Sequence, residues 1–564
     1  LVCALAIATV LRVDAETNRL PGLTYFPANG AIVCENGTRW DNRPLYCNER
    51  FTLIKAGEQP GLSGPMGRMY VAVARGETKL LLHQFLNRVG RYRPGRMEWE
   101  LTDPRLPGVT AKLLGTTLAN ADGYTACLWI EGAQAGDLAG WCIVPPNAEK
   151  ASEYRVRTEM NGFVLDRVPE TKLAQIRGRF SAPVAKWEKA LFKGHDSLLT
   201  TSELASESIK GEALIAWLPI ILGGAQSIAV VADDNDPKFY AALVRREKLL
   251  DPAAIANAGK AFDDGFAHVA RFDAQVEVCT PDPYFNAGVS ASVAAAFGLF
   301  VDPCFVHGGS AWRNQSPGWR TMGAAFNYGF HDQVKRSIAF WGSLQVKTNK
   351  GSSKGVYSPN GCQQAGDSRF FGQGFIDYKQ PPHYEFQTQF FDEAVRAWRA
   401  TADPELEKQL LPMLELHLKR CQECFDPDGD GLYESYNNTW PNDSVWFNGG
   451  GTVEQSAYVY YGERAAADMQ RRKGNSGAAA QHTAQAGKIQ KALDRVLWLE
   501  PRGHYAAYVE AGGHRRVHDD AWIYSQHLPI EAGMATAMQS WQAMYYPFPA
   551  AGNDKGGLTA ALIS

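Results

Sequence analysis

The chain has little net charge and no long apolar segment after its first residues. Its 57 Lys and Arg are balanced by 60 Asp and Glu, which leaves a formal net charge of −3. This balance gives no electrostatic reason to expect a nucleic acid or an anionic membrane as partner. No run beyond the N-terminal stretch is long enough to cross a bilayer as a helix, so no membrane span is expected.

Cysteine patterns typical of metal sites are also scarce. Cys421 and Cys424 form a lone Cys-x-x-Cys pair, and no second pair follows at the spacing of a zinc site. The sequence does not assign disulfides among the ten cysteines. Candidate pairs are Cys34 with Cys47 and Cys127 with Cys142.

The first 15 residues are an apolar run that closes with Val13-Asp14-Ala15. Small residues at such a place are what a signal peptidase requires. The run therefore predicts a truncated secretory signal peptide over 1–15 and a secreted or periplasmic protein. The alternative is a buried strand.

Strand signals fill the first half of the chain, which at 564 residues is too long for one hydrophobic core. Short apolar or alternating runs such as Tyr70–Ala74 and Met97–Leu101 are separated by Gly, Pro, Asn and Asp. This spacing predicts a β-sandwich domain over 20–235. A charged helical pattern after Pro237 predicts a helical linker over 236–279.

Helical patterns dominate after residue 280. Asp403-Pro404 is a good helix start, and Thr452 with Gln455 forms the pattern of a capping box. Further helices are expected over 285–300, 319–346, 386–400, 476–498 and 530–546. Paired helices with long loops on alternate connections are typical of an (α/α) toroid, which we expect over 280–564, incomplete at its C-terminus.

The segment from Asp426 to Glu454 is the most informative part of the chain. It gathers carboxylates, Asn, Gly and two tryptophans, Trp440 and Trp446, between two helical patterns. A loop this long inside a compact domain usually carries function. Carboxylates beside aromatic rings suit sugar chemistry, because the acids move protons and the rings stack on pyranose faces.

Several motifs resemble those of the six-hairpin (α/α)6 glycosidases. They are Thr280–Gly288, His307–Arg313 followed by Gly318–Arg320, and Asp426–Trp440 followed by Ser456–Tyr458. The last run is similar to one in bacterial β-glucosidases related to human bile-acid glucosylceramidase, although Asn438 stands where those enzymes have Asp. The chain most resembles a secreted bacterial family of unknown function associated with glycoside hydrolase family 154, whose described activity is on β-glucuronides.

This resemblance implies an N-terminal β-sandwich, a helical connector and a C-terminal (α/α)6 toroid. It also implies hydrolysis of terminal sugars, in particular β-linked glucuronic acid, from oligosaccharides or polysaccharides. Such hydrolysis needs two carboxyl groups across one sugar. The candidates for the acid are Asp443, Glu434 and Glu454, and those for its partner are Glu385 and Glu531. The alternative for each acid candidate is a loop-capping or sugar-binding carboxylate. For Glu454 and Glu385 the alternative is an acid that favours a helix N-terminus.

Other residues are candidates for substrate binding. Arg reads a carboxylate through two parallel hydrogen bonds, so Arg313 and Arg320 suit a uronic acid, unless they pair with structural acids. The remaining candidates are Trp312, His331, Asp332, Trp440, His518 and Asp520.

Asp426, Asp428 and Asp430 with Gly431 match the first half of a calcium-binding loop. Position twelve of such a loop is Asn437 rather than Glu, so the alternative is a plain Asp/Gly turn. No cofactor is required for glycoside hydrolysis, and calcium is the one metal that the sequence suggests.

Three other functions remain open at this point. A glycoside phosphorylase would need a phosphate pocket in place of one carboxylate. A polysaccharide lyase of (α/α) toroid fold would need a Tyr/His pair and a neutralising Arg, for which Tyr384, His383 and Arg313 are available. A non-catalytic glycan-binding protein is the third alternative, which the departure at Asn438 favours.

Overall fold

The computed structural model describes residues 24–28, 30–45, 54–119, 121, 123–168, 173–205, 207–234, 252–306, 321–348, 356–357, 370–371, 373–377, 384–434, 437–438, 445–446, 450–521 and 523–545. The chain divides into two compact units, which are described separately below. The first contains residues 1–302 and 309–311, and the second contains 303–308 and 312–564. Among the described residues, no helix combines the length and apolarity needed to cross a membrane.

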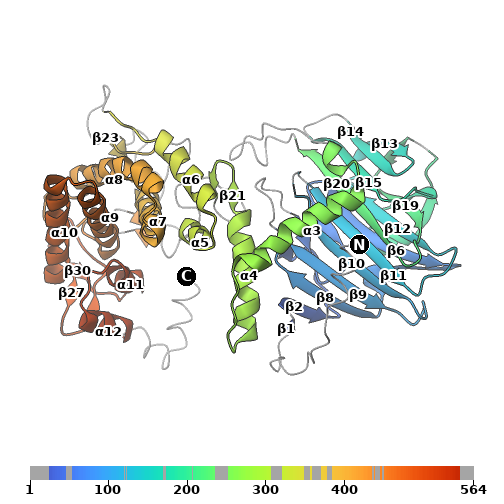
Figure 1. Cartoon of the computed structure of the whole chain (residues 1–564), viewed down its shortest axis with the longest axis horizontal. Coiled ribbons are helices and arrows are strands. Elements are labelled where there is room, and N and C mark those ends of the chain that lie inside the picture. The colour runs from blue at the N-terminus through green and yellow to red at the C-terminus, as the bar shows by residue number, and fades with distance from the viewer. Residues whose placement is uncertain are drawn as a thin grey trace. The chain divides into compact units, whose positions relative to one another are not determined.

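Two antiparallel sheets make up most of the first unit (Figure 1). In spatial order, the 11-stranded sheet contains β1 (Tyr25–Ala28), β2 (Ala31–Glu35), β8 (Asn87–Arg93), β9 (Arg96–Thr102), β10 (Thr110–Thr117), β11 (Gly123–Glu131), β20 (Ala225–Asp234), β15 (Leu173–Phe180), β14 (Gly162–Val168), β13 (Glu153–Glu159) and β18 (Ser208–Lys210). The 9-stranded sheet contains β17 (Thr201–Glu203), β16 (Lys186–Leu191), β19 (Glu212–Pro219), β12 (Leu138–Val144), β6 (Gly67–Arg75), β5 (Leu62–Gly64), β4 (Lys55–Ala56) and β3 (Arg43–Pro44), with β7 (Thr78–Leu81) paired to β6.

The main core of this unit lies between the two sheets, and it combines Trp99 and Leu113 of the first sheet with Val71 and Trp141 of the second. Strand β9 shows why one face of its sheet forms the core. Met97, Trp99 and Leu101 are buried, and the residues between them are partly exposed. Because side chains alternate across a strand, this sequence can bury only one of its faces. A β-sandwich was expected here, and the structure confirms large antiparallel sheets.

Cys127 and Cys142 correct one sequence expectation. They lie on β11 and β12, which are consecutive in the chain but belong to different sheets, and no disulfide joins them. Cys34 is not in a disulfide with any described residue, and Cys47 lies outside the described residues.

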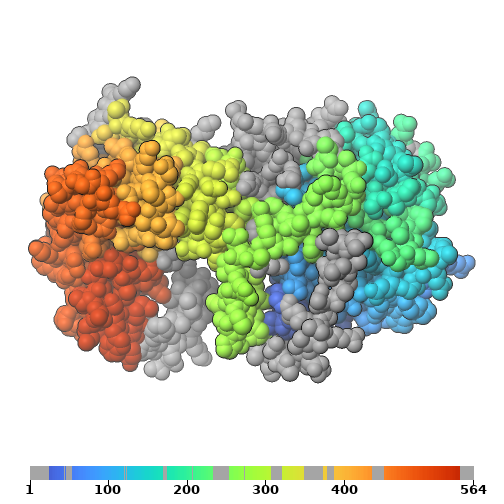
Figure 2. Space-filling model, viewed as in Figure 1, coloured from blue at the N-terminus to red at the C-terminus, as the bar shows by residue number. Residues whose placement is uncertain are grey.

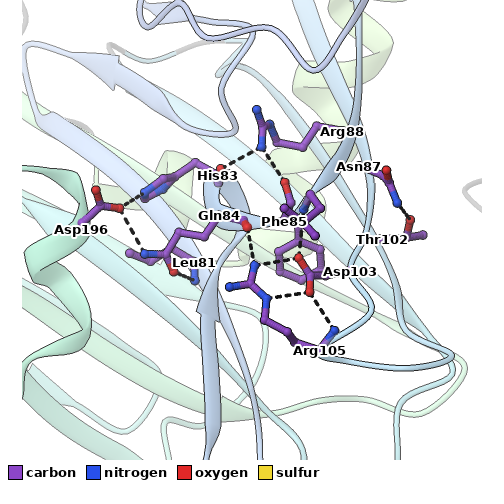
Figure 3. A network of polar contacts seen from close by, with 11 residues as sticks. Leu81, His83, Gln84, Phe85, Asn87, Arg88, Thr102, Asp103, Arg105 and Asp196 are labelled. Carbon is purple, nitrogen blue, oxygen red and sulfur yellow. Dashed lines mark hydrogen bonds and ion pairs between the residues drawn. The ribbon is translucent and has the colours of Figure 1, made fainter.

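The connection from β7 to β8, which passes from the second sheet to the first, is fixed by the polar network in Figure 3. It contains the short 3-10 helix η2 (Leu82–Gln84). His83 and Gln84 both contact Asp196, at 3.0 and 3.1 Å, and Asp196 belongs to η4 (His195–Leu199). Asp103 accepts from the backbone of Leu86 (2.9 Å) and from Arg105, whose hydrogen bond lowers the pKa of Asp103 to about 2.

Helix α3 (Ala258–Gln275) lies across the outer face of the 11-stranded sheet, where Ala258 and Ala261 pack on Ala229 and Val231 (Figure 1). The unit also contains α4 (Pro283–Gly298), which begins at the N-cap Asp282, and β21 (Phe300–Val301). Two further 3-10 helices are η3 (Ala148–Lys150) and η5 (Pro252–Ile255). The division between the compact units thus falls after α4, whereas the sequence suggests a boundary at 280, which stays a prediction.

The second unit is built of helices joined by short strands. On the face shown in Figure 2, the orange to red residues, those after about residue 400 on the colour bar, lie together. Its helices are α5 (Thr321–Asn327), α6 (His331–Ser343), α7 (Tyr384–Thr401), α8 (Pro404–Phe425), α9 (Val453–Arg472), α10 (Ser476–Val496), α11 (Ile523–Glu531) and α12 (Ala537–Tyr545). Its strands are β22 (Cys304–Phe305), β23 (Val356–Tyr357), β24 (Phe370–Phe371), β25 (Asn437–Asn438), β26 (Val445–Trp446), β27 (Trp498–Leu499), β28 (His504–Tyr505), β29 (Tyr508–Val509) and β30 (Val517–His518).

Local signals explain two helix starts and one helix end. Asp403 caps α8 by accepting from Glu405 N (2.8 Å), as its sequence predicts. Thr452 caps α9 by accepting from Gln455 N (3.2 Å). The expected helix over 319–346 is wrong: the chain forms α5 and α6 instead, because Gly329 adopts a left-handed φ of 88° that ends α5.

Candidate functional site

Helices α7, α9 and α11 run parallel to one another. Arg396 and Arg399 of α7 both place their guanidinium groups over the ring of Tyr461 in α9, and Arg399 also reaches Asp468 one to two turns further on. Residue numbers therefore rise together along α7 and α9. At the start of α9, the N–H of its first residue, Val453, donates to Ala507 O (3.2 Å). Helix α11 follows the strands around Ala507 in the chain and packs on α9. The first turns of the three helices consequently lie at one end of this group.

We call this end the polar end, because polar side chains are buried in the first two turns of the three helices there. A buried polar group costs free energy unless it is hydrogen-bonded, so a concentration of such groups is typical of a functional site. The set comprises Gln387, Thr388 and Gln389 of α7, Glu454, Gln455 and Ser456 of α9, and Ser525 and Gln526 of α11.

Backbone contacts bring Glu434 to the polar end. Its N–H donates to Phe425 O (2.7 Å), and Glu434 forms an isolated β-bridge with Gly451. The next residue, Thr452, donates to Tyr433 O (3.0 Å) and then caps α9. The loop that leaves α8 and the segment that enters α9 are thus held side by side, with Glu434 on one and Glu454 two residues beyond Thr452 on the other.

Glu454 lies in the first turn of α9, and only 4% of the residue is exposed. Two helical turns separate it from Tyr461, so both residues lie on the same face of α9. Because Tyr461 contacts α7, this face of α9 is the one directed at α7. The carboxylate of Glu454 is therefore buried near the first turns of α7.

The two expected partner carboxylates lie at different levels of the helix group. Position 385 is in the first turn of α7, at the polar end, and strand β25 lies next to this helix. Glu531 is the last residue of α11, where it contacts Arg396 Nη2 (3.2 Å) and His527 Nδ1 (3.4 Å). Arg396 is about three turns from position 385, on the order of 16 Å along α7. The structure therefore brings position 385, and not Glu531, to the level of Glu434 and Glu454.

His518 is held at the polar end by the hairpin of β29 and β30. Its ring stacks on Tyr508 at 4.1 Å, and its Nε2 lies 3.0 Å from Glu510 Oε1. Tyr508 in turn forms a β-bridge with Thr452, the N-cap of α9. The hydrogen bond with His518 lowers the pKa of Glu510. Asp520 follows this hairpin and is exposed.

His331 and Asp332 lie elsewhere. They form the first turn of α6, where His331 stacks on Phe326 at 4.3 Å. One turn later, Lys335 contacts Asp403, the N-cap of α8, which follows the end of α7. The structure therefore places His331 and Asp332 near the end of the helix group that is opposite the polar end.

Five predicted site residues lie outside the described residues: Trp312, Arg313, Arg320, Trp440 and Asp443. For Glu385, only the backbone is described. The roles expected for these residues stay predictions.

The three aspartates of the calcium-like motif do converge. Carboxylate oxygens of Asp426, Asp428 and Asp430 lie within 4.8 Å of one another. Positive groups already face them, since Arg515 contacts Asp430 at 2.8 Å and Lys488 contacts Asp426 at 3.4 Å. Asp426 also accepts from Gly431 N (3.1 Å), and its burial raises its pKa. The donor set suits calcium in type, but the two cations supply much of the charge that a metal would bring.

Sequence reasoning missed several charged residues inside the helix group. Glu393 is buried in α7 and accepts from the first N–H groups of α5, including Met322 N (2.7 Å). His482 of α10 lies between Glu463 and Glu415, at 2.6 and 3.8 Å. These contacts join residues of different helices, so no pattern of neighbouring residues in the sequence predicts them.

Comparisons with known proteins show the fold. A scan against protein-family models and a search of curated proteins both find no match. Among solved structures, a bacterial glucoamylase complexed with acarbose matches with a TM-score of 0.52 and 10% identity, over 94% of this chain and 80% of that chain. A family GH92 inverting mannosidase from Bacteroides thetaiotaomicron matches with a TM-score of 0.42 and 11% identity, over 93% of this chain and 76% of its own. A family GH78 rhamnosidase of Bacillus sp. GL1 has a TM-score of 0.35 and 12% identity, over 73% of this chain and 37% of its own.

The likeness to the glucoamylase spans nearly the whole chain, and at this identity it concerns the fold alone. The chain therefore has a multidomain, glycosidase-like fold of large antiparallel sheets and helices. Closure of the helices into a complete toroid remains a prediction.

Proposed function

We propose that the protein is a glycoside hydrolase whose reaction takes place at the polar end of α7, α9 and α11. The observation that carries this proposal is the pairing of two segments by the Glu434–Gly451 bridge, which brings the carboxylates of Glu434 and Glu454 to the same end of the helices. Support comes from the whole-chain fold likeness to a glucoamylase, an enzyme captured with acarbose.

The proposed chemistry uses two carboxyl groups. A carboxylic acid from the segment between Glu434 and Glu454, which includes Asp443, protonates the leaving oxygen. Glu385, in the first turn of α7, acts on the anomeric carbon or on the attacking water. Glu454 is a buried carboxyl group of this segment, with 4% of the residue exposed.

We propose terminal β-linked glucuronic acid as the substrate, because the sequence resembles a family with activity on β-glucuronides; Arg313 and Arg320 suit such a charged sugar. An Arg pair recognises the uronate carboxylate through bidentate hydrogen bonds. A secreted or periplasmic location, from the N-terminal apolar run, accords with an extracellular glycan as substrate.

The proposal is tested by measuring water-dependent sugar release from aryl β-glucuronides and aryl β-glucosides. We expect one of Glu434→Gln, Asp443→Asn and Glu454→Gln to lower kcat by about 100-fold or more on poor leaving groups, and far less on activated phenols, which need little protonation. The matched control is Glu405→Gln, which changes an exposed first-turn acid of α8.

Three results would contradict parts of the proposal. Full activity in all three carboxylate variants would contradict the proposal that the acid lies between Glu434 and Glu454. An unsaturated product absorbing in the ultraviolet would indicate a lyase, and phosphate-dependent release a phosphorylase. Equal losses on glucuronides and glucosides after Arg313→Ala and Arg320→Ala remove the uronide specificity.

A further inference from the structure

The hairpin of β29 and β30 is attached at its base to the segment that carries the polar end. Tyr508 forms a β-bridge with Thr452, and Val509 N–H donates to Gly451 O at 2.9 Å. Gly451 is itself the bridge partner of Glu434. Three backbone segments are therefore joined edge to edge here, with Glu434 on the first, the N-cap of α9 on the second and the hairpin on the third.

The tip of the same hairpin is attached to the start of the first segment. Arg515 extends its guanidinium to the turn that follows α8, where Nη2 lies 2.8 Å from Asp430 and Nη1 lies 3.6 Å from Asp428. This turn leads directly into Glu434. The hairpin thus makes two contacts near Glu434. At its tip, Arg515 contacts the Asp428–Asp430 turn that leads into Glu434. At its base, Val509 contacts Gly451, the bridge partner of Glu434.

The backbone of Arg515 is in a conformation that a residue with a side chain rarely adopts. Its φ is 49°, in the left-handed region, which favours glycine. Two glycines, Gly512 and Gly513, precede it in the same tip and have open space around them. An arginine held in this conformation at an exposed tip needs a compensating contact, and the ion pair with Asp428 and Asp430 provides one.

We infer that Arg515 is a positioning residue: by fixing the hairpin tip to the Asp428–Asp430 turn, it sets the separation between Glu434 and Glu454, and dissolved salt weakens its effect. The inference rests on the proposed function, because it assigns a role at the same site. Salt sensitivity follows from exposure, since 51% of the Arg515 side chain is accessible and exposed ion pairs are screened at high ionic strength.

The activity test compares Arg515→Ala, Arg515→Lys and Arg516→Ala, with Arg516 as the neighbouring exposed cation of the same tip. We expect Arg515→Ala to lower kcat about fivefold with little change in KM, and Arg515→Lys to restore about half of the loss, because one ammonium contacts one carboxylate at a time. Arg516→Ala should stay within about twofold. Raising NaCl to about 0.5 M should lower kcat of the wild type and leave Arg515→Ala unchanged.

Hydrogen exchange of residues 505–518 tests the contact without any assay of activity. We expect faster exchange in Arg515→Ala and not in Arg516→Ala. Unchanged exchange in Arg515→Ala, or an equal salt response in wild type and variant, would overturn the positioning role. A wild type that releases no sugar from any substrate would overturn the proposed function and the positioning role together, while the exchange data would still report whether the tip contact exists.

Discussion

Arg396 in α7 and Glu531 at the end of α11 form an ion pair, with Nη2 and Oε2 separated by 3.2 Å. Arg396 also contacts Asp392 at 2.8 Å and lies over the ring of Tyr461. Burial lowers the pKa of Arg396, but these partners raise it by more, so Arg396 stays protonated and positively charged. A single guanidinium thereby links α7, α9 and α11, well away from their first turns.

The first prediction concerns Glu531, a carboxylate that sequence alone suggests for catalysis. Glu531→Gln should lower the free energy of unfolding by about 1 kcal/mol, a modest value because the pair is partly exposed. It should leave kcat within about threefold, since Glu531 is occupied by Arg396 and His527. Thermal melting and steady-state kinetics check both parts. A loss of kcat as large as that of Glu454→Gln, with unchanged melting, would make Glu531 a catalytic carboxylate instead.

The second prediction is a loss of stability at alkaline pH through His482. Hydrogen bonds with Glu415 and Glu463 raise the pKa of His482 from 6.5 to about 9. The charged imidazole is favoured in the folded state, so its contribution is complete below pH 6.5 and is lost as the pH rises through about 9. We expect about 1 to 2 kcal/mol of stability to disappear over this window, after allowance for solvent screening.

Denaturant unfolding at several pH values between 6 and 10 measures this effect. His482→Gln should flatten the stability profile across that range. His514→Gln, at the exposed hairpin tip, is the matched control and should leave the profile unchanged. Parallel profiles for wild type and His482→Gln would show that the cluster does not titrate in this window.

The third prediction is an acid effect through His417. This imidazole is buried in α8, where it stacks on Phe391 at 4.2 Å and contacts Gln387 at 3.0 Å. Burial holds its pKa well below 6.5, so the folded protein keeps it neutral while the unfolded chain binds a proton below pH 6.5. Stability should therefore fall by up to about 1.4 kcal/mol per pH unit as the pH drops below 6.5. His417→Gln should remove this slope, and an unchanged slope would contradict the assignment.

Local and distant relationships explain what the sequence could predict. Asp403 and Thr452 cap their helices because the cap and the N–H groups that it serves lie within three residues, so the pattern is readable. The break between α5 and α6 depends on the left-handed conformation of Gly329, which an apolar pattern does not reveal. At the candidate site, the loop from Asp426 was predictable from composition. The contacts of Arg515 with Asp430 and of Arg396 with Glu531 were not, because they join elements distant in sequence.

The fourth prediction concerns calcium at the Asp426–Asp430 turn. In the wild type, 5 mM calcium should raise the melting temperature by about 1 °C or less, because Arg515 and Lys488 already neutralise the carboxylates. Arg515→Ala frees Asp428 and Asp430 from their shared cation, so calcium should stabilise that variant more. Melting curves with calcium and with magnesium measure the difference. Strong calcium stabilisation of the wild type would show that the metal displaces Arg515.

The last prediction concerns Gly450, which precedes Gly451, the bridge partner of Glu434. It compares a glycine whose side-chain space is filled with one that is constrained by its backbone conformation alone. The φ of Gly450 is 106°, and a Cβ there would lie 1.9 Å from Val509 O in the hairpin. Gly474, after α9, is the matched control: its φ is 78°, but a Cβ would meet nothing within 4 Å. Gly474→Ala should lower the free energy of unfolding by about 1 kcal/mol, because only the unfavourable backbone conformation acts there. Gly450→Ala should lower the free energy of unfolding by about 3 kcal/mol or more, because the hairpin must move away from the new methyl group. The same movement should speed hydrogen exchange in residues 505–518. Equal costs for the two variants would mean that the hairpin does not pack on Gly450 in solution.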